Sequence, residues 1–314
     1  MRNDRAKHAL AFGIISTMMF SAARAAGPAS GSALPPAAPP GVKSMADLLA
    51  ATKPRDWRPL DPENTIYLEL AAGRVVIELA PAFAPNHVAN VKALAREGYF
   101  DGLAIIRSQD NYVVQWGRGE DDPRSRAIAS KKVAPEFFRA MDPKLPFTPL
   151  SYPDTYAPEV GFSAGFPVAR DPKKKQTWLV HCYGSVGVGR DNAPDSGNGS
   201  ELYAVIGQSP RGLDRNITVV GRVVQGIEKL SVIPRGPGPM GFYDKPSEWT
   251  PIRTAKLAAD VPPAQRLNLE ALKTESATFK TVVETRATRK EAWFHEPVGR
   301  IGVCNVPLPV RLKP

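Results

Sequence analysis

Proline recurs at short intervals along this chain, and that spacing is the strongest constraint on what the chain can fold into. Proline contributes 32 of the 314 residues, about twice its usual share. Because proline lacks a backbone donor and clashes with the preceding helical turn, long uninterrupted helices are disfavoured. The sequence therefore predicts a protein of strands, short helices and long connections.

The clearest regular pattern lies in residues 65–79. Apolar and polar side chains alternate over 65–70 and again over 75–79, with a short Ala-Ala-Gly break between the two runs. Alternation with a period of two is typical of strands with one buried face, and the short break indicates a β-hairpin. A helix is expected to begin at Ala84-Pro85-Asn86 and to end at Gly98.

Further strands and one long interruption follow this hairpin. Strands are expected at 103–107, 112–116, 177–181, 185–189, 202–206, 217–224 and 252–258. Residues 118–176, between the second and third of these strands, are polar and rich in proline. We interpret them as a loop insertion with one short helix at 136–141. Many strands and few helices, without regular strand–helix–strand alternation, favour a mainly β fold, a closed antiparallel barrel capped by helices.

The N-terminus has the three-part pattern of a secretory signal peptide. Basic residues precede an apolar run over 9–20, and Ala23-Arg24-Ala25 follows as a cleavage pattern. A buried N-terminal helix is the alternative interpretation. The run is too short for a permanent anchor, and no later segment reaches about 18 apolar residues. We therefore expect a secreted or periplasmic protein with no membrane span in the mature chain.

These features predict a domain order. Residues 1–25 would form the signal peptide and 26–60 a tether and lead-in rich in proline and alanine. Residues 61–261 would form the barrel, with the insertion at about 118–176. Residues 262–314 would form a C-terminal extension, helical and then extended. Its helices could dock on the barrel or join two copies in a dimer.

Charge and cysteine content limit the chemistry further. The formal net charge is +10 at pH 7, but the basic residues are scattered and only residues 173–175 form a run, so a nucleic-acid partner is not expected. Two cysteines cannot build a four-cysteine zinc site. Cys182 and Cys304 could pair in an oxidising compartment or remain thiols, and the sequence leaves both possibilities open.

Four blocks of sequence, taken in order, resemble the cyclophilin family of peptidyl-prolyl cis-trans isomerases. The blocks are residues 73–91, the run from Gly98 to Gly117 that contains Ile105-Ile106-Arg107 and Tyr112-Val113-Val114-Gln115, then Gly199-Ser200-Glu201-Leu202-Tyr203, and residues 213–223. The spacings from the arginine to the aromatic residue and on to the glutamine match the family. Together the blocks cover about 65–258, apart from the insertion.

The resemblance implies an eight-stranded barrel that rotates the peptide bond before proline, with no metal or other cofactor. This rotation is slow because the amide loses resonance as it twists. A fixed guanidinium can donate to the lone pair that the prolyl nitrogen gains in the twisted state. Arg107 matches the family arginine in this catalytic role. Gln115 matches the glutamine that steadies the arginine and binds the substrate backbone.

The other matched positions are expected to bind proline-containing polypeptides. They are Tyr112, Val113, Glu201, Leu202, Tyr203, Leu213 and Ile217, with Arg190 placed only loosely because its loop is longer than in the family. Some positions depart from the family pattern: Ile106 replaces a histidine before the arginine, Tyr203 a phenylalanine, and Ile217 a pocket histidine. The expected function is an isomerase that assists folding of exported proteins. The alternative is a cyclophilin-like binding or chaperone module with little isomerase activity.

Two further motifs suggest other chemistry. Residues 161–165 fit the G-x-S-x-G pattern of serine hydrolases, with His181 and His295 as conceivable bases, but that motif requires a strand before it and a helix after it. Asp191, Asp195 and Glu201 punctuate a polar stretch. Their spacing does not match a calcium-binding EF-hand loop, so a polar turn is the better interpretation.

Overall fold

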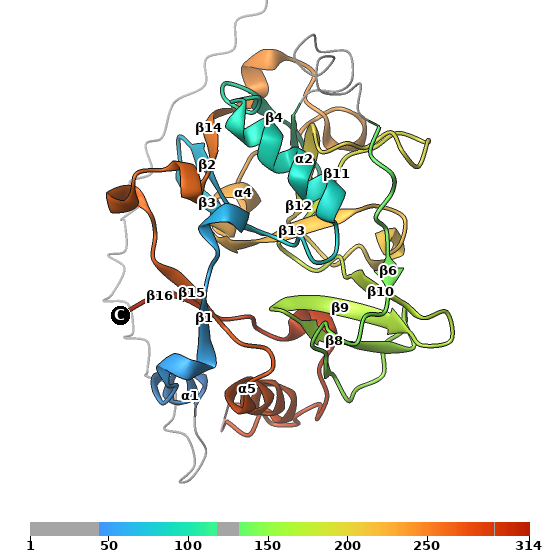
Figure 1. The fold of residues 1–314 in the computed structure, drawn as a ribbon, viewed down its shortest axis with the longest axis vertical. Helices are drawn as coiled ribbons and strands as arrows, with labels where there is room; N and C mark the ends of the chain where they lie inside the picture. Colours follow the sequence, from blue (N-terminus) through green and yellow to red (C-terminus); the bar gives the residue numbers. More distant parts are fainter. Residues whose placement is uncertain (1–43, 118–131, 292) are drawn as a thin grey trace, which may run out of the picture. The chain divides into compact units, whose positions relative to one another are not determined.

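The computed structural model describes residues 44–117, 132–291 and 293–314, all within one compact unit. The predicted signal peptide and the first part of the tether lie outside these residues. Eight of the described strands close into an antiparallel barrel (Figure 1). In barrel order they are β11 (Ser185–Val188), β12 (Glu201–Val205), β5 (Val113–Gly117), β4 (Ala104–Ser108), β14 (Thr250–Leu257), β2 (Thr65–Leu70), β3 (Gly73–Leu79) and β13 (Val219–Gln225). The predicted barrel is confirmed.

The β2–β3 hairpin shows how the alternating pattern builds this barrel. Ile66 pairs with Ile77 and Leu68 with Val75 across the antiparallel strands, and all four side chains are buried in the barrel core. Gly73 follows the turn with a φ of 113°, a conformation that glycine adopts without steric cost. The period of two therefore directs one face of each strand into the barrel.

Two helices pack against the barrel core, and the first of them was predicted. Helix α2 (Pro85–Arg96) begins with proline in its first turn, where the missing N–H costs no hydrogen bond. Its side chains Val91 and Leu94 are fully buried in the core. Helix α4 (Ile227–Ser231) contributes Leu230 to the same core.

The insertion differs from the expectation of a loop with one helix. It contains a second antiparallel sheet whose strands are, in sheet order, β6 (Arg139–Ala140), β10 (Gln176–Leu179), β9 (Phe166–Asp171), β8 (Glu159–Ser163) and β7 (Thr148–Pro149). The helix predicted at 136–141 was wrong. Residues 139 and 140 pair with β10 instead, so contact with a distant strand decides the conformation of this segment. The strand expected at 177–181 belongs to this sheet and not to the barrel.

Both faces of the second sheet are covered, as Figure 1 shows for β8 and β9, which lie between the barrel and α5. On one face, Phe166 and Val168 pack with Phe83 and Val219, which belong to the barrel half of the molecule. On the other face the sheet packs against α5 through Phe162, whose ring lies 5.0 Å from that of Phe279. The second sheet is therefore built into the molecule between two apolar cores.

The C-terminal extension is also only partly helical. Helix α5 (Ala277–Thr288) is present, with Phe279 and Val282 fully buried. The first part of the extension, predicted to be helical, contains instead the strand β15 (Leu269–Leu272). That strand lies between β1 (Trp57–Pro59) and β16 (Val310–Leu312) in a three-stranded sheet. The conformation of residues 269–272 therefore depends on pairing with β1 and β16, which are distant in sequence. A further helix of the described residues is α1 (Met45–Ala50), whose Met45 and Leu49 pack against the α5 core.

Cys182 and Cys304 form a disulfide that spans 122 residues of sequence, with their Cα atoms 5.0 Å apart. The structure thereby decides between the two possibilities that the sequence left open. The bond joins the segment after β10 to the C-terminal segment, and Cys182 belongs to the same apolar core as α5.

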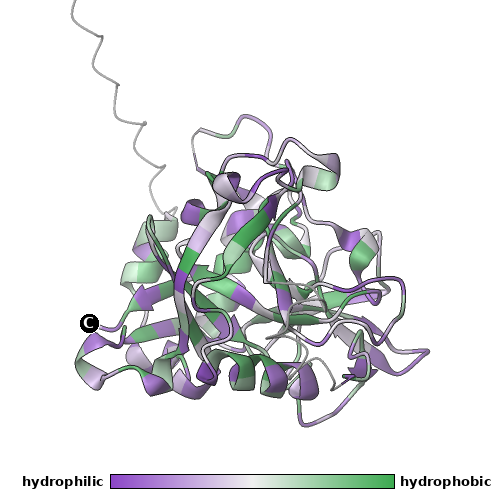
Figure 2. Ribbon diagram, turned by 90° about the horizontal axis from the view of Figure 1, so that it is seen from above, coloured by the Kyte–Doolittle hydropathy of each residue, from purple (hydrophilic) through white to green (hydrophobic). Residues whose placement is uncertain are grey.

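Apolar and polar residues lie side by side along the same strands and helices in Figure 2, as expected for elements with one buried and one exposed face. Among the residues that the structure describes, no helix is both long and apolar enough to cross a membrane.

Candidate active site

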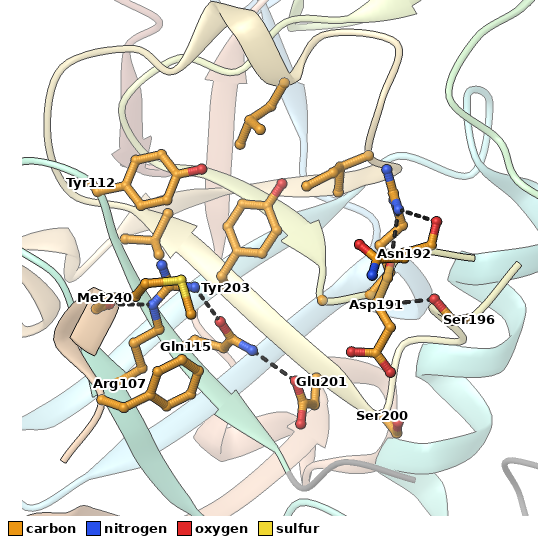
Figure 3. A pocket seen from close by; sticks show the side chains of 16 residues that line it. Arg107, Tyr112, Gln115, Asp191, Asn192, Ser196, Ser200, Glu201, Tyr203 and Met240 are labelled. Atoms are coloured by element: carbon orange, nitrogen blue, oxygen red, sulfur yellow. Dashed lines mark hydrogen bonds between the residues drawn. The ribbon is translucent and has the colours of Figure 1, made fainter. Parts of the chain in front are cut away.

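An open pocket of about 650 Å³ lies on the outer face of the barrel beside β5 and β12 (Figure 3). It gathers side chains from four separate parts of the sequence: the β4–β5 region, the loop before β12, the 3₁₀ helix η3 (Arg211–Leu213) with its flank, and a turn near residue 240. The predicted site residues that line it are Arg107, Tyr112, Val113, Gln115, Glu201, Tyr203, Leu213 and Ile217. Arg190 also lines it.

Leu202 does not line the pocket, and its assignment to substrate binding was wrong. In the β12–β5 pair, Tyr203 lies opposite Gln115 and Leu202 lies opposite Trp116. Successive strand residues point to opposite faces. Gln115 and Tyr203 therefore face the pocket, while Leu202 and Trp116 are buried inside the barrel.

Arg107 is held in place at one wall of the pocket. Its Nη1 donates to Oε1 of Gln115 over 3.0 Å, its Nε donates to the carbonyl of Met240 over 2.7 Å, and its Nη2 donates to Gln109. The Phe242 ring lies 5.2 Å from the guanidinium carbon. Burial lowers the pKa of Arg107, but a guanidinium stays charged at any physiological pH. The result is a fixed cation facing an open pocket.

Gln115 connects this arginine to an acidic group (Figure 3). The side-chain oxygen of Gln115 accepts from Arg107, while its Nε2 donates to Oε2 of Glu201 over 2.7 Å. The opposite charges at its two ends fix the orientation of the amide. Burial raises the pKa of Glu201 above its ordinary value of 4.5, and the hydrogen bond from Gln115 opposes that effect.

The raised pKa of Glu201 predicts how stability changes with pH. A group whose pKa is higher in the folded than in the unfolded state binds its proton more tightly when folded, so stability falls as pH rises through the folded pKa. We expect the wild type to lose stability relative to Glu201→Gln as the pH rises from below 4.5. Above the folded pKa the difference should level off.

Denaturant unfolding of the wild type and Glu201→Gln between pH 3.5 and 8 measures this difference. All other titrating groups are common to both proteins, so the change with pH in the difference between their unfolding free energies reports on Glu201 alone. The raised pKa would be contradicted if this difference stayed constant, or if the wild type gained stability relative to Glu201→Gln as the pH rises.

Sequence reasoning missed the pocket residues that lie in loops. Met240 and Phe242 line the pocket, and Phe242 forms an isolated β-bridge with Arg107. Asp191, Asn192 and Ser196 line the opposite rim. Neither periodicity nor a matched motif marks these positions. For Met240, the contribution is a backbone carbonyl, which any residue provides.

The hydrolase motif is contradicted by the geometry around Ser163. Residues 161–165 end β8 and enter a tight turn into β9, so a strand follows where a nucleophile motif requires a helix. The Ser163 side chain is 1% exposed. The ring nitrogens of His181, one conceivable base, contact Asp214 and Tyr203. Asp195, considered as a calcium ligand, pairs instead with Lys132 over 2.9 Å.

Comparison with known proteins agrees with this geometry. The family model described as cyclophilin type peptidyl-prolyl cis-trans isomerase/CLD matches residues 65–257, from the start of β2 to the end of β14. A probable peptidyl-prolyl cis-trans isomerase of Brucella suis is 30% identical over 176 residues, which cover 56% of this chain and 74% of the relative. The human peptidyl-prolyl cis-trans isomerase-like 1 is 25% identical over 214 residues, 68% of this chain and 99% of the relative.

A solved structure extends the likeness beyond the barrel. The crystal structure of a cyclophilin from Hirschia baltica covers 87% of this chain and 99% of its own, with 25% sequence identity and a TM-score of 0.64. Since the matched family range spans more than half of the sequence and contains the whole barrel, this chain belongs to the family of cyclophilin-type peptidyl-prolyl cis-trans isomerases.

Proposed function

We propose that this isomerase acts at the pocket around Arg107 and assists the folding of exported proteins by rotating their X-Pro bonds. The observation that carries the proposal is Arg107 itself, a cation held by three hydrogen bonds beside apolar side chains. Val113, Leu213 and Ile217 supply an apolar surface suited to a proline ring.

The guanidinium retains donors for a substrate. Of its five N–H groups, three are used in the hydrogen bonds to Met240, Gln115 and Gln109 that the described residues provide. A remaining N–H can donate to the prolyl nitrogen as that nitrogen becomes pyramidal. The planar amide offers no such lone pair, so the hydrogen bond is strongest in the twisted state and lowers the rotational barrier.

Two features support a site of action outside the cytoplasm. Residues 1–25 have the composition of a cleavable signal peptide, and the disulfide between Cys182 and Cys304 is of a kind that persists in oxidising compartments. Exported proteins fold in those compartments without cytoplasmic chaperones. An isomerase there would act on proline-containing segments of unfolded clients.

Export is tested by expressing the full chain in a Gram-negative bacterium, fractionating the cells and determining the N-terminus by mass spectrometry. We expect a periplasmic product beginning at Ala26, with Cys182 and Cys304 oxidised. A matched variant with Leu10→Arg and Ile14→Arg, which interrupts the apolar run, should remain uncleaved in the cytoplasm. An uncleaved wild-type chain in the cytoplasmic fraction would contradict the proposal.

A further inference from the structure

A second feature of the pocket is the buried hydroxyl of Tyr203. Tyr203 lines the pocket with its ring and is only 4% exposed. Its hydroxyl lies 2.8 Å from Nε2 of His181, and the two rings are nearly parallel. The residue opposite Tyr203 on β11 is Gly187, where a Cβ atom would overlap the tyrosine hydroxyl. The strand pair thus leaves room for a hydroxyl below the ring.

His181 is itself held by a buried carboxylate. Oδ1 of Asp214 accepts from the backbone N–H of His181 and lies 3.0 Å from its Nδ1. Burial acts to raise the pKa of Asp214, but the hydrogen bond from His181 and the charge of Arg211 outweigh it and lower that pKa. Because the ionised carboxylate only accepts, Nδ1 carries a proton and the imidazole orientation is fixed.

The network continues into the insertion. Nε of Arg211 donates to Oδ2 of Asp214 over 2.6 Å, and its two Nη atoms donate to both carboxylate oxygens of Asp154 over 2.8 and 2.9 Å. Asp154 lies between β7 and β8 of the second sheet, and His181 follows β10 of that sheet. Arg211 and Asp214 flank Leu213, which forms another part of the pocket surface.

The burial of this network makes it stiff. The side chains of His181, Asp214 and Arg211 are 0%, 6% and 6% exposed, and that of Asp154 is 10% exposed. Buried polar groups that are all paired resist displacement, because any movement leaves a charge or donor without a partner. The network therefore fixes the position of the Tyr203 ring and of the segment that carries Leu213. No hydrogen bond among the described residues joins it to Arg107 or Gln115.

We propose that His181 is a positioning residue for substrate binding, which anchors the Tyr203 hydroxyl and makes the inserted sheet part of the proline pocket. The inference rests on the proposed function, because it assumes that this pocket receives the X-Pro segment. Its consequence is a division of labour: Arg107 and Gln115 act on the twisting bond, while the Tyr203–His181–Asp214–Arg211–Asp154 network shapes the surface on which the proline ring rests.

A double-mutant cycle on the mature protein tests this. His181→Ala and Tyr203→Phe should each raise KM for an X-Pro peptide about three- to tenfold, the range expected for losing one buried hydrogen bond. Their kcat values should stay within about twofold, because the groups at the twisting bond are unchanged. The double variant should resemble the more affected single variant, because both changes break the same contact.

The matched control is Tyr183→Phe, which removes a tyrosine hydroxyl that contacts Ser231, outside the pocket and the network, at a position that is 47% exposed. Its KM should equal that of the wild type. If His181→Ala does not fold, Asp154→Asn replaces it, at the far end of the network from the pocket. Asp154→Asn should raise KM alone but add little to Tyr203→Phe.

Two results would overturn the inference: a folded His181→Ala protein with unchanged KM, or effects of the two changes on KM that multiply. If Asp154→Asn is used in place of His181→Ala, effects of Asp154→Asn and Tyr203→Phe on KM that multiply would also overturn the inference. Wild-type activity is measured in the same assay. A folded but inactive wild type would refute the proposed function, whereas an active wild type with an unaffected KM in the variants would refute the positioning role alone.

Discussion

Arg107→Ala should lower kcat/KM for an X-Pro peptide by about 100- to 1000-fold, the range found when one preorganised donor to a transition state is removed. The loss should fall mainly on kcat, because the lone pair that Arg107 contacts develops only as the bond twists. The hydrogen bonds from Arg107 to Gln115 and to the carbonyl of Met240 hold its guanidinium at the pocket wall. Protease-coupled kinetics on the mature protein measure the effect.

Two other arginine substitutions sharpen this result. Arg253→Ala removes an exposed arginine from β14, outside the pocket, and should leave kcat/KM within about twofold of the wild type. Arg107→Lys keeps a positive charge but not the planar fork that binds Gln115, Gln109 and Met240 together. It should recover only part of the activity. An Arg107→Ala protein that retains a third or more of wild-type kcat/KM would rule out the catalytic role.

The disulfide should make the largest contribution of any covalent feature to stability. Replacing both Cys182 and Cys304 by serine should lower the free energy of unfolding by about 2–5 kcal/mol, because the bond restricts a long loop of the unfolded chain. The loop spans 122 residues. For a protein of this size, the melting temperature should fall by roughly 3–9 °C. The bond also holds the C-terminal segment against the core that contains α5.

Chemical denaturation of the oxidised wild type and the double serine variant measures this difference. Reductant should bring the wild type down to the stability of the variant and should leave the variant unchanged. Neither cysteine lines the active-site pocket, so isomerase activity at low temperature should persist in both forms. Equal unfolding free energies for the oxidised wild type and the variant would show that the bond constrains nothing.

The barrel was predictable because its strands carry local information. The alternation over 65–79 indicates which side chains of β2 and β3 enter the barrel core, and short turns fix their pairing. The second sheet gave no such signal. Residues 160–163 are buried on both faces of β8, which removes the alternation that identifies a strand. The leucines of β15 fit either periodicity over so short a run, and their conformation depends on β1 and β16, which are distant in sequence.

In the active site, too, the residues on strands with a local sequence pattern were predictable. Residues on β4, β5 and β12 were predicted to lie together, and they do. Leu202 and Tyr203 are successive residues of β12 and point to opposite faces of the strand, so Leu202 faces the barrel core. Met240 and Phe242 come from a turn without periodicity. For His181, the sequence offered only a conceivable hydrolase base. Its partners Asp214 and Tyr203 are 33 and 22 residues away, and only the folded chain brings them together.

The central claim is that the pocket around Arg107 accelerates rotation about X-Pro bonds. NMR exchange spectroscopy of a short X-Pro peptide, with and without a catalytic amount of the mature wild-type protein, measures that rotation directly. The uncatalysed exchange takes tens of seconds or longer. We predict exchange cross-peaks between the cis and trans resonances on a timescale of about a second or less, where the peptide alone gives none. A well-folded wild-type protein that leaves the peptide without exchange would contradict the account.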